Sequence, residues 1–177
     1  METRNTRVLT GLFRDRDSAE RAYQSISDRG YGSEDVNLVM SDDTRKRHFA
    51  TATADGRRTE LGTKAAEGAG IGGAIGGSLG AIAAAIAAVG TTIALPGLGL
   101  VIAGPIAAAI AGAGAGAATG GIVGALIGWG IPEERVKEYD LGIRDGGILM
   151  AVRPRSDDDA SFLEDSWKSH RGEHVYR

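Results

Sequence analysis

Two histidines near the C-terminal end of the sequence have the spacing of a metal-binding pair. His170 and His174 are four residues apart with Glu173 beside them, and imidazole with carboxylate is a common ligand set for divalent metals. Gly172 disfavours the helix that would bring both imidazoles to one face, and no third ligand is indicated nearby. The pattern therefore predicts a solvated C-terminal segment, and we expect no metal site.

Residues 68–73 match the pattern G-x-G-x-x-G, which binds the pyrophosphate of dinucleotides when it follows a strand and opens a helix. Here the pattern follows the charged, helix-like residues 63–67, and no acidic residue that could bind a ribose appears before Glu133. A phosphate-binding loop of the form G-x-x-x-x-G-K-[ST] is missing from the sequence despite its 28 glycines. We therefore expect no cofactor.

The remaining charged clusters have simple structural explanations. Residues 157–159 are three aspartates, which are typical of the acidic first turn of a helix. Basic residues at 45–48 and 57–58 could contact anionic lipid headgroups or phosphate, but the aspartates at 42, 43 and 55 dilute them. The sequence shows no Ser/His/Asp grouping, nucleophile elbow or facing carboxylate pair. We therefore predict that the protein is not an enzyme, with no catalytic residue and no small-molecule substrate.

Composition narrows the possible partners. The net charge is −3 without a clustered basic excess, which argues against a nucleic-acid partner. The chain has no cysteine, which excludes disulfides and thiol catalysis. Residues 1–5 are polar and lead directly into a strand-like run, so we expect no secretory signal and a cytoplasmic location.

The dominant feature is an uncharged stretch at residues 68–132, which holds 19 of the 28 glycines. Small residues recur there at every fourth position, so they share one face of a helix and let another backbone approach closely. We predict a helical hairpin with arms at 68–94 and 101–130 that turns near residues 94–97. The predicted helix-packing glycines are Gly68, Gly72, Gly76 and Gly80 in the first arm and Gly104, Gly112, Gly116, Gly120, Gly124 and Gly128 in the second.

The flanks of this insert carry two β-α-β patterns. Apolar runs predict strands at 7–13, 36–40, 147–152 and 174–176, and residues 41–63 read as a loop or linker. Three helices are expected: one capped by Asp17 and ended by Gly30, one with Pro132 as its first residue and ended by Gly142, and one capped by Ser156. The pattern predicts an α+β, ferredoxin-like domain with helices on one face of an antiparallel sheet. Residues 1–60 form its first half, 61–131 the glycine-zipper hairpin and 132–177 its second half.

Several motifs resemble the bacterial heat-induced general stress protein domain in its glycine-zipper form. They are Thr10-Gly11-Leu12-Phe13, Ala19-Glu20-Arg21-Ala22, Asp35-Val36-Asn37-Leu38-Val39, the glycine-rich block, Gly130-Ile131-Pro132-Glu133-Glu134 and Gly146-Gly147-Ile148-Leu149. The resemblance covers nearly the whole chain. It implies a small, stress-associated bacterial protein, and it transfers no active site.

Two placements of the insert fit its composition. Helical arms of about 40–45 Å would be long enough to cross a hydrocarbon core of about 30 Å, with Trp129 at the interface and basic residues at the base of the hairpin. Both flanks would then lie on the cytoplasmic side of the inner membrane, in contact with lipid. The alternative is a water-soluble homo-oligomer whose core consists of hairpins from several copies. In both cases the expected partner is the protein itself.

Overall fold

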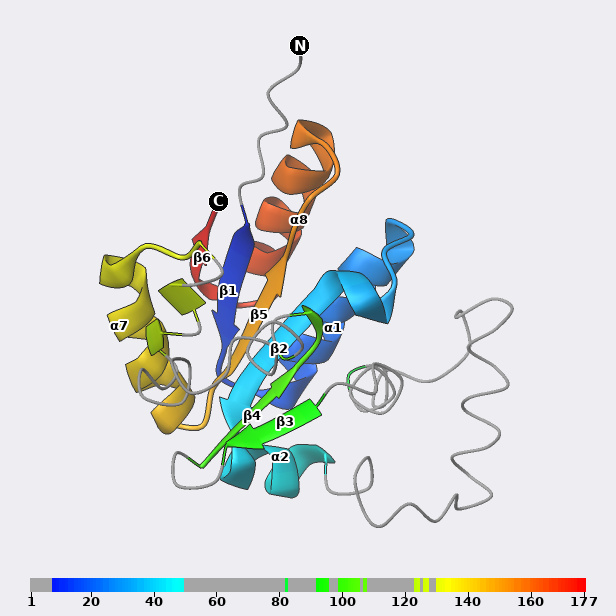
Figure 1. Cartoon of the computed structure of the whole chain (residues 1–177). Coiled ribbons are helices and arrows are strands. Elements are labelled where there is room, and N and C mark those ends of the chain that lie inside the picture. Colours follow the sequence, from blue (N-terminus) through cyan, green and yellow to red (C-terminus); the bar gives the residue numbers. More distant parts are fainter. Residues whose placement is uncertain are drawn as a thin grey trace, which may run out of the picture.

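The computed structural model describes residues 8–49, 82, 92–95, 99–105, 107, 123–124, 126–127 and 130–177. These residues form an α+β fold in which one antiparallel sheet, ordered β3-β4-β2-β5-β1-β6, packs with four α-helices (Figure 1). The strands are β1 (Leu9–Phe13), β2 (Val36–Ser41), β3 (Thr92–Leu95), β4 (Leu100–Ala103), β5 (Ile148–Val152) and β6 (Glu173–Tyr176). The helices are α1 (Arg16–Asp28), α2 (Asp42–Phe49), α7 (Glu133–Arg144) and α8 (Asp157–Ser169), with a 3-10 turn at Ser33–Asp35.

The centre of the sheet joins segments from both sides of the insert. Strand β5 lies between β1 and β2, so that Leu149 is paired with Leu12 on one side and with Val39 on the other. Strand β6 extends the sheet beyond β1. Residues 8–49 and 130–177 therefore build one sheet, which is why strands far apart in the sequence lie side by side.

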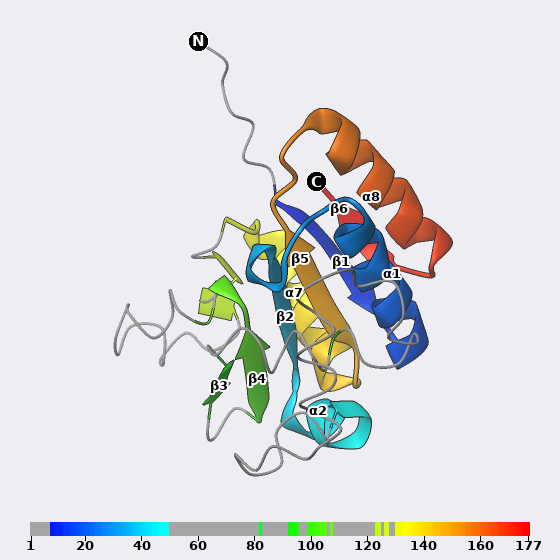
Figure 2. The same ribbon diagram turned by 90° about the vertical axis from the view of Figure 1, so that its right-hand side faces the viewer.

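Helices cover both faces of this sheet. Helices α1 and α8 lie on one face and α7 lies on the other (Figures 1 and 2). In β5, Met150 belongs to the core cluster that contains α1 and α8, whereas its neighbour Leu149 belongs to the cluster that contains α7. The expectation of helices on one face only is therefore wrong. The physical reason is that all successive residues of the central strand β5 are apolar and buried, so both faces of the sheet need cover.

Three predictions about helices differ from the structure. The N-cap of α1 is Asp15, whose side chain accepts the Ser18 N–H, and not Asp17. Residues 42–49, expected to be a loop, form α2. Gly142 does not end α7 but lies inside it, where a side chain would clash with Leu12. The predicted stop at Gly30 is confirmed, with a φ of 77° directly after the C-cap.

The turn of the insert also differs from its prediction. Residues 92–95 and 100–103 form the antiparallel pair β3–β4, and β4 continues the sheet beside β2. The prediction that the adjoining ends of the two arms are helical is therefore wrong at these positions. Leu100, Val101 and Ile102 are apolar and mostly β-branched, and the exposed edge of β2 offers unpaired backbone groups to such a run.

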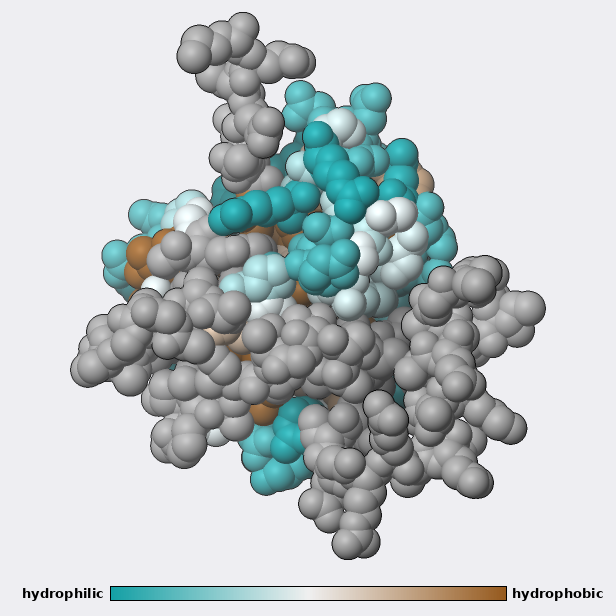
Figure 3. Space-filling model, turned by 45° about the vertical axis from the view of Figure 1, so that its right-hand side comes forward, coloured by the Kyte–Doolittle hydropathy of each residue, from teal (hydrophilic) through white to brown (hydrophobic). Residues whose placement is uncertain are grey.

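The described surface in Figure 3 is largely hydrophilic, with only small apolar areas. Among the described residues, the large apolar side chains with substantial exposure are Ile127, Leu141 and Phe162. The domain therefore buries almost all of its described apolar residues.

Candidate functional site

A buried carboxylate on α1 contacts the insert. Glu20 is 3% exposed, and its Oε2 accepts the backbone N–H of Ile82 at 3.0 Å. Ile82 is fully buried in the core cluster that contains α1 and α8. A residue of the insert is thus packed and hydrogen-bonded against the domain, 62 positions from its partner.

Arg16 on α1 and the end of α2 also take part in this contact. We call it the insert junction (Arg16, Glu20, His48, Phe49 and Ile82). Arg16 and Glu20 are one helical turn apart, and Arg16 Nε lies 3.6 Å from Glu20 Oε1. Arg16 Nη1 donates to the His48 carbonyl oxygen at 2.7 Å, and its guanidinium lies 5.1 Å from the Phe49 ring centroid. The charge of Glu20 is therefore matched by a cation that also fixes the end of α2. This chemistry is suited to holding a segment in place.

The second attachment of the insert is at Gly104, directly after β4. Its φ is 107°, and a Cβ there would clash with the carbonyl oxygen of Val36 at the start of β2. Both facts require glycine, because L side chains rarely adopt this φ. The structure therefore places Gly104 against a strand, whereas the sequence suggested a helix-packing role.

A buried tyrosine links α7 to the edge of the sheet. Tyr139 is fully buried; its Oη donates to the His174 carbonyl oxygen at 2.8 Å and lies 2.7 Å from Thr10 Oγ1. The imidazole of His174 pairs with Glu138 at 3.0 Å. Burial raises the pKa of Tyr139 to about 12. At neutral pH the phenol is therefore a neutral hydrogen-bond donor that positions β6.

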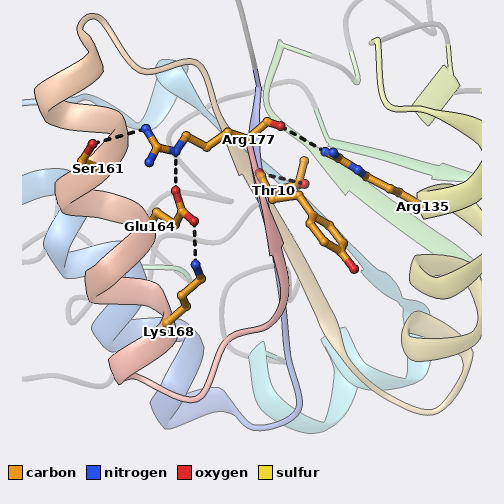
Figure 4. A network of polar contacts seen from close by, with 7 residues as sticks. Thr10, Arg135, Ser161, Glu164, Lys168 and Arg177 are labelled. Atoms are coloured by element: carbon orange, nitrogen blue, oxygen red, sulfur yellow. Dashed lines mark hydrogen bonds and ion pairs between the residues drawn. The ribbon is translucent and has the colours of Figure 1, made fainter.

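Arg177 connects the same strand to helices on both faces (Figure 4). Its guanidinium contacts Glu164 and donates to Ser161 Oγ on α8, while its carbonyl oxygen accepts from Arg135 Nη1 on α7 at 3.2 Å. Lys168 lies 2.5 Å from Glu164, and the two cations lower the pKa of that carboxyl group. This network stabilises the last strand. Its carboxylate, that of Glu164, is paired with both Lys168 and Arg177.

The residues that sequence patterns singled out for metal chemistry do not come together. His174 pairs with Glu138, whereas His170 Nδ1 lies 3.4 Å from Ser166 Oγ on α8. The Asp159 carboxylate accepts a hydrogen bond from the Tyr31 hydroxyl group and pairs with Arg29. Among residues 8–49 and 130–177 and the shorter described segments, no group of three metal-ligating side chains occurs.

Most of the predicted helix-packing glycines lie outside the described residues, and Gly104 and Gly124 are the two that the structure describes. A Cβ at Gly124 would meet none of the described atoms within 4 Å. Those outside the described residues are Gly68, Gly72, Gly76, Gly80, Gly112, Gly116, Gly120 and Gly128, together with the basic pair at 57–58 and the dinucleotide-like pattern at 68–73.

Comparison of the chain with protein-family models, curated proteins and solved structures finds no match. The resemblance to the heat-induced general stress protein domain therefore stays a prediction from its motifs. In the described part of the chain, no helix has the length and apolar character needed to cross a bilayer.

The insert junction is the site that inspection of the sequence missed. From the sequence, Glu20 is expected to complete a capping box with Asp17. In the structure the N-cap is Asp15, and the Glu20 carboxylate is buried against Ile82, which only the fold brings close. One signal was present: Arg16 and Glu20 stand at i and i+4 on a helix whose other positions include Ala19 and Tyr23 on the buried face.

Tyrosine ionisation is expected to destabilise the fold at alkaline pH. Burial raises the pKa of both Tyr139 and Tyr23 to about 12, above their ordinary value of 10.0. Because the folded pKa is the higher one, this stabilisation is complete below pH 10 and is lost as the pH rises through 12. We expect unfolding followed by circular dichroism to coincide with the phenolate absorbance, and the Tyr139→Phe variant to lose part of this pH dependence. A phenolate transition that precedes unfolding would contradict the prediction.

Proposed function

We propose that this chain is a non-enzymatic, stress-associated protein that self-assembles through its glycine-rich insert. In this proposal the α+β domain is the rigid part that holds the insert in place. The assignment to stress rests on the motif resemblance. The domain is proposed to be ferredoxin-like, since the strand order β2-β5-β1-β6 with α1 and α8 as connections supports that plan. The insert would then interrupt the domain between β2 and β5.

The observation that carries the proposal is the environment of Gly124. Leu126, two residues away, is 1% exposed in the core cluster that contains α7. Gly124 itself has open space beyond its Cα among the described atoms, and Ile127 is 43% exposed. The described helical residues 123, 124, 126 and 127 thus turn an apolar side chain into the domain and a glycine away from it. In the proposal, the spacing of four residues puts the other glycines of the sequence series on the same helix face as Gly124, which favours contact with another helix.

The described contacts of the insert support pairing between copies. Ile82 of the first arm is buried with α1 and α8, whereas Ala107 and Leu126 of the second arm are buried with α7 on the other face of the sheet. At these positions the arms are separated by the sheet, so they do not pack against each other. The absence of arm-to-arm packing at these described positions supports the proposal that the small-residue faces pair with a second copy of the chain.

The same burial favours the soluble homo-oligomer over the membrane-inserted form. Ile82, Ala107 and Leu126 pack inside the chain's own cores, so these positions do not face lipid. We therefore propose a cytoplasmic, soluble assembly in which the glycine faces meet. Association with the inner membrane, with lipid as a partner, is the second candidate, and it rests on the length and apolar composition of the insert.

Replacing Gly124 with leucine is expected to reduce assembly while the domain keeps its stability. The added side chain meets no described atom of its own chain, but it would hold a neighbouring helix away. Sedimentation velocity should show smaller particles than the wild type at equal concentration, with an unchanged urea midpoint. The control is Leu141→Gln, which alters an exposed side chain on α7 and should leave particle size unchanged. An unaltered particle size for Gly124→Leu would contradict assembly through this face.

Fractionation of cells separates the two placements. Recovery of the wild type in the soluble fraction as a large particle supports the soluble assembly. Retention in the membrane pellet after carbonate extraction would overturn it in favour of insertion.

A further inference from the structure

Helices α1 and α8 lie next to each other on one face of the sheet (Figure 2). Residues of both helices line a groove. We call it the α1–α8 groove, and its volume is about 310 Å³. It is lined by Arg21, Gln24, Ser25 and Asp28 from α1 and by Phe162, Ser166 and His170 from α8. The lining residues recur every three or four positions on both helices, so they form two facing ridges.

The two helices run in opposite directions, which gives the groove two different ends. Trp167 Nε1 donates to the Ala22 carbonyl oxygen at 3.3 Å, and the Arg29 guanidinium lies 4.1 Å from the Phe162 ring centroid. The start of α1 is therefore beside the end of α8. As a result, Arg21 and His170 mark one end of the groove, and Asp28 and Phe162 mark the other.

The charged groups at these ends form no ion pair within the described part of the chain, and the aromatic ring, which already contacts Arg29, remains partly exposed. Neither Arg21 nor Asp28 has an ion-pair partner within 4.0 Å among these residues; Asp28 accepts one hydrogen bond, from Gln24. Phe162 is 42% exposed despite its size. Small side chains, Ser25 and Ser166, stand at the middle of the groove.

We propose that the α1–α8 groove is a self-complementary interface that joins two copies of this chain about a two-fold axis. Arg21 and Asp28 are seven residues apart, about 10 Å along the helix, and their midpoint lies at residues 24–25. When α1 packs antiparallel to its copy across this midpoint, each Arg21 meets an Asp28 and each His170 meets a Phe162. The serines at the centre let the helices approach closely. Such pairing of one patch with itself is what a two-fold interface requires.

This interface lies on the domain and does not depend on the insert, so it goes beyond assembly through glycine faces. It would give each copy two contacts, one through the domain and one through the insert. A chain with two such contacts can grow beyond a dimer.

Charge reversal gives a direct test with a built-in rescue. Arg21→Glu places two like-charge pairs in the homodimer, and Asp28→Lys does the same with opposite sign. Each variant alone should weaken this contact by about tenfold or more, whereas an equal mixture of the two restores both ion pairs. Contact formation in the mixture but in neither variant alone is the expected result. Equal contact in all samples would overturn the proposal, and so would failure of the mixture to recover.

Disulfide trapping in the full-length chain measures this contact separately from other assembly. The chain contains no cysteine, so Gln24→Cys introduces a single thiol beside the proposed axis. Oxidation should give a covalent dimer in high yield, with the yield reduced by Arg21→Glu and restored by mixing with Asp28→Lys. Leu141→Cys, on the opposite face of the sheet, is the matched control, and its cross-linking should not respond to these charges.

The two proposals fail in different ways. Gly124→Leu should leave the Gln24→Cys cross-link intact while it reduces the size of the larger particle. A cross-link that is absent in a normally sized particle overturns the groove interface alone. If the cross-link forms but Gly124→Leu does not change the particle size, only the proposed assembly through the insert is contradicted.

Discussion

The Trp167→Ala variant is expected to lose about 3–5 kcal/mol of unfolding free energy, since removal of a buried aromatic side chain takes away its apolar contacts and leaves a cavity. Trp167 is fully buried on α8, and its ring meets the Phe13 ring edge-on at a centroid distance of 5.7 Å. Its Nε1 also donates to the carbonyl oxygen of Ala22 on α1. The side chain thus joins α8 to both the sheet and α1.

The loss is large because domains of this kind have only about 5–15 kcal/mol of total stability. Urea unfolding followed by circular dichroism measures the difference in midpoint at constant slope. Phe162→Ala on the same helix is the matched control, because its ring is 42% exposed, and we expect a change of at most about 1 kcal/mol. Equal losses in the two variants would show that burial of Trp167 is not what holds α8 to the sheet.

The Glu20→Ala variant is expected to lose about 3 kcal/mol, because it removes the carboxylate that a partly buried cation and a buried amide share. The lost partners are Arg16, whose side chain is 27% exposed, and the backbone N–H of Ile82. The partial exposure of Arg16 is the reason for choosing the lower part of the usual range. The effect should concentrate at the insert junction, so the Ile82 amide should exchange its hydrogen faster than in the wild type.

Two further variants isolate the role of the carboxylate. Glu20→Gln keeps an acceptor for the Ile82 amide but removes the charge opposite Arg16, so we expect a smaller loss than for Glu20→Ala. Gln24→Ala changes an exposed residue one turn further along α1 and should stay within about 0.5 kcal/mol of the wild type. If Glu20→Ala unfolds like Gln24→Ala, with unchanged exchange at Ile82, the junction does not hold the insert.

Sequence patterns predict the elements of this domain where local chemistry decides the structure. The core of each strand at 9–13, 36–40, 148–152 and 174–176 is found in the structure within two residues of its predicted limits. The Ser156 cap of α8 is confirmed, because its side chain accepts the Asp159 N–H. Apolar runs, caps and glycine stops act over a few residues, so they can be recognised without knowledge of the fold.

Long-range contacts explain the differences. Gly142 reads as a helix stop, yet α7 continues because Leu12 of β1 occupies the space where a side chain would be. Residues 101–103 read as the start of a helical arm, yet with Leu100 they form β4 and pair with β2, whose edge is unpaired without them. Neither neighbour is close in the sequence, so no local pattern could reveal it.

By itself, the sequence determined the α+β class, the two β-α-β halves around an uncharged glycine-rich insert, and the regular small-residue spacing that predicts self-association. These features follow from residue type and period, which act locally. Only the tertiary structure decided that helices cover both faces of the sheet, that Glu20 is buried against Ile82, and that Arg21 and Asp28 share one groove with Phe162 and His170. Burial, and the pairing of charges that goes with it, depends on which distant segments meet, and that is a property of the folded chain.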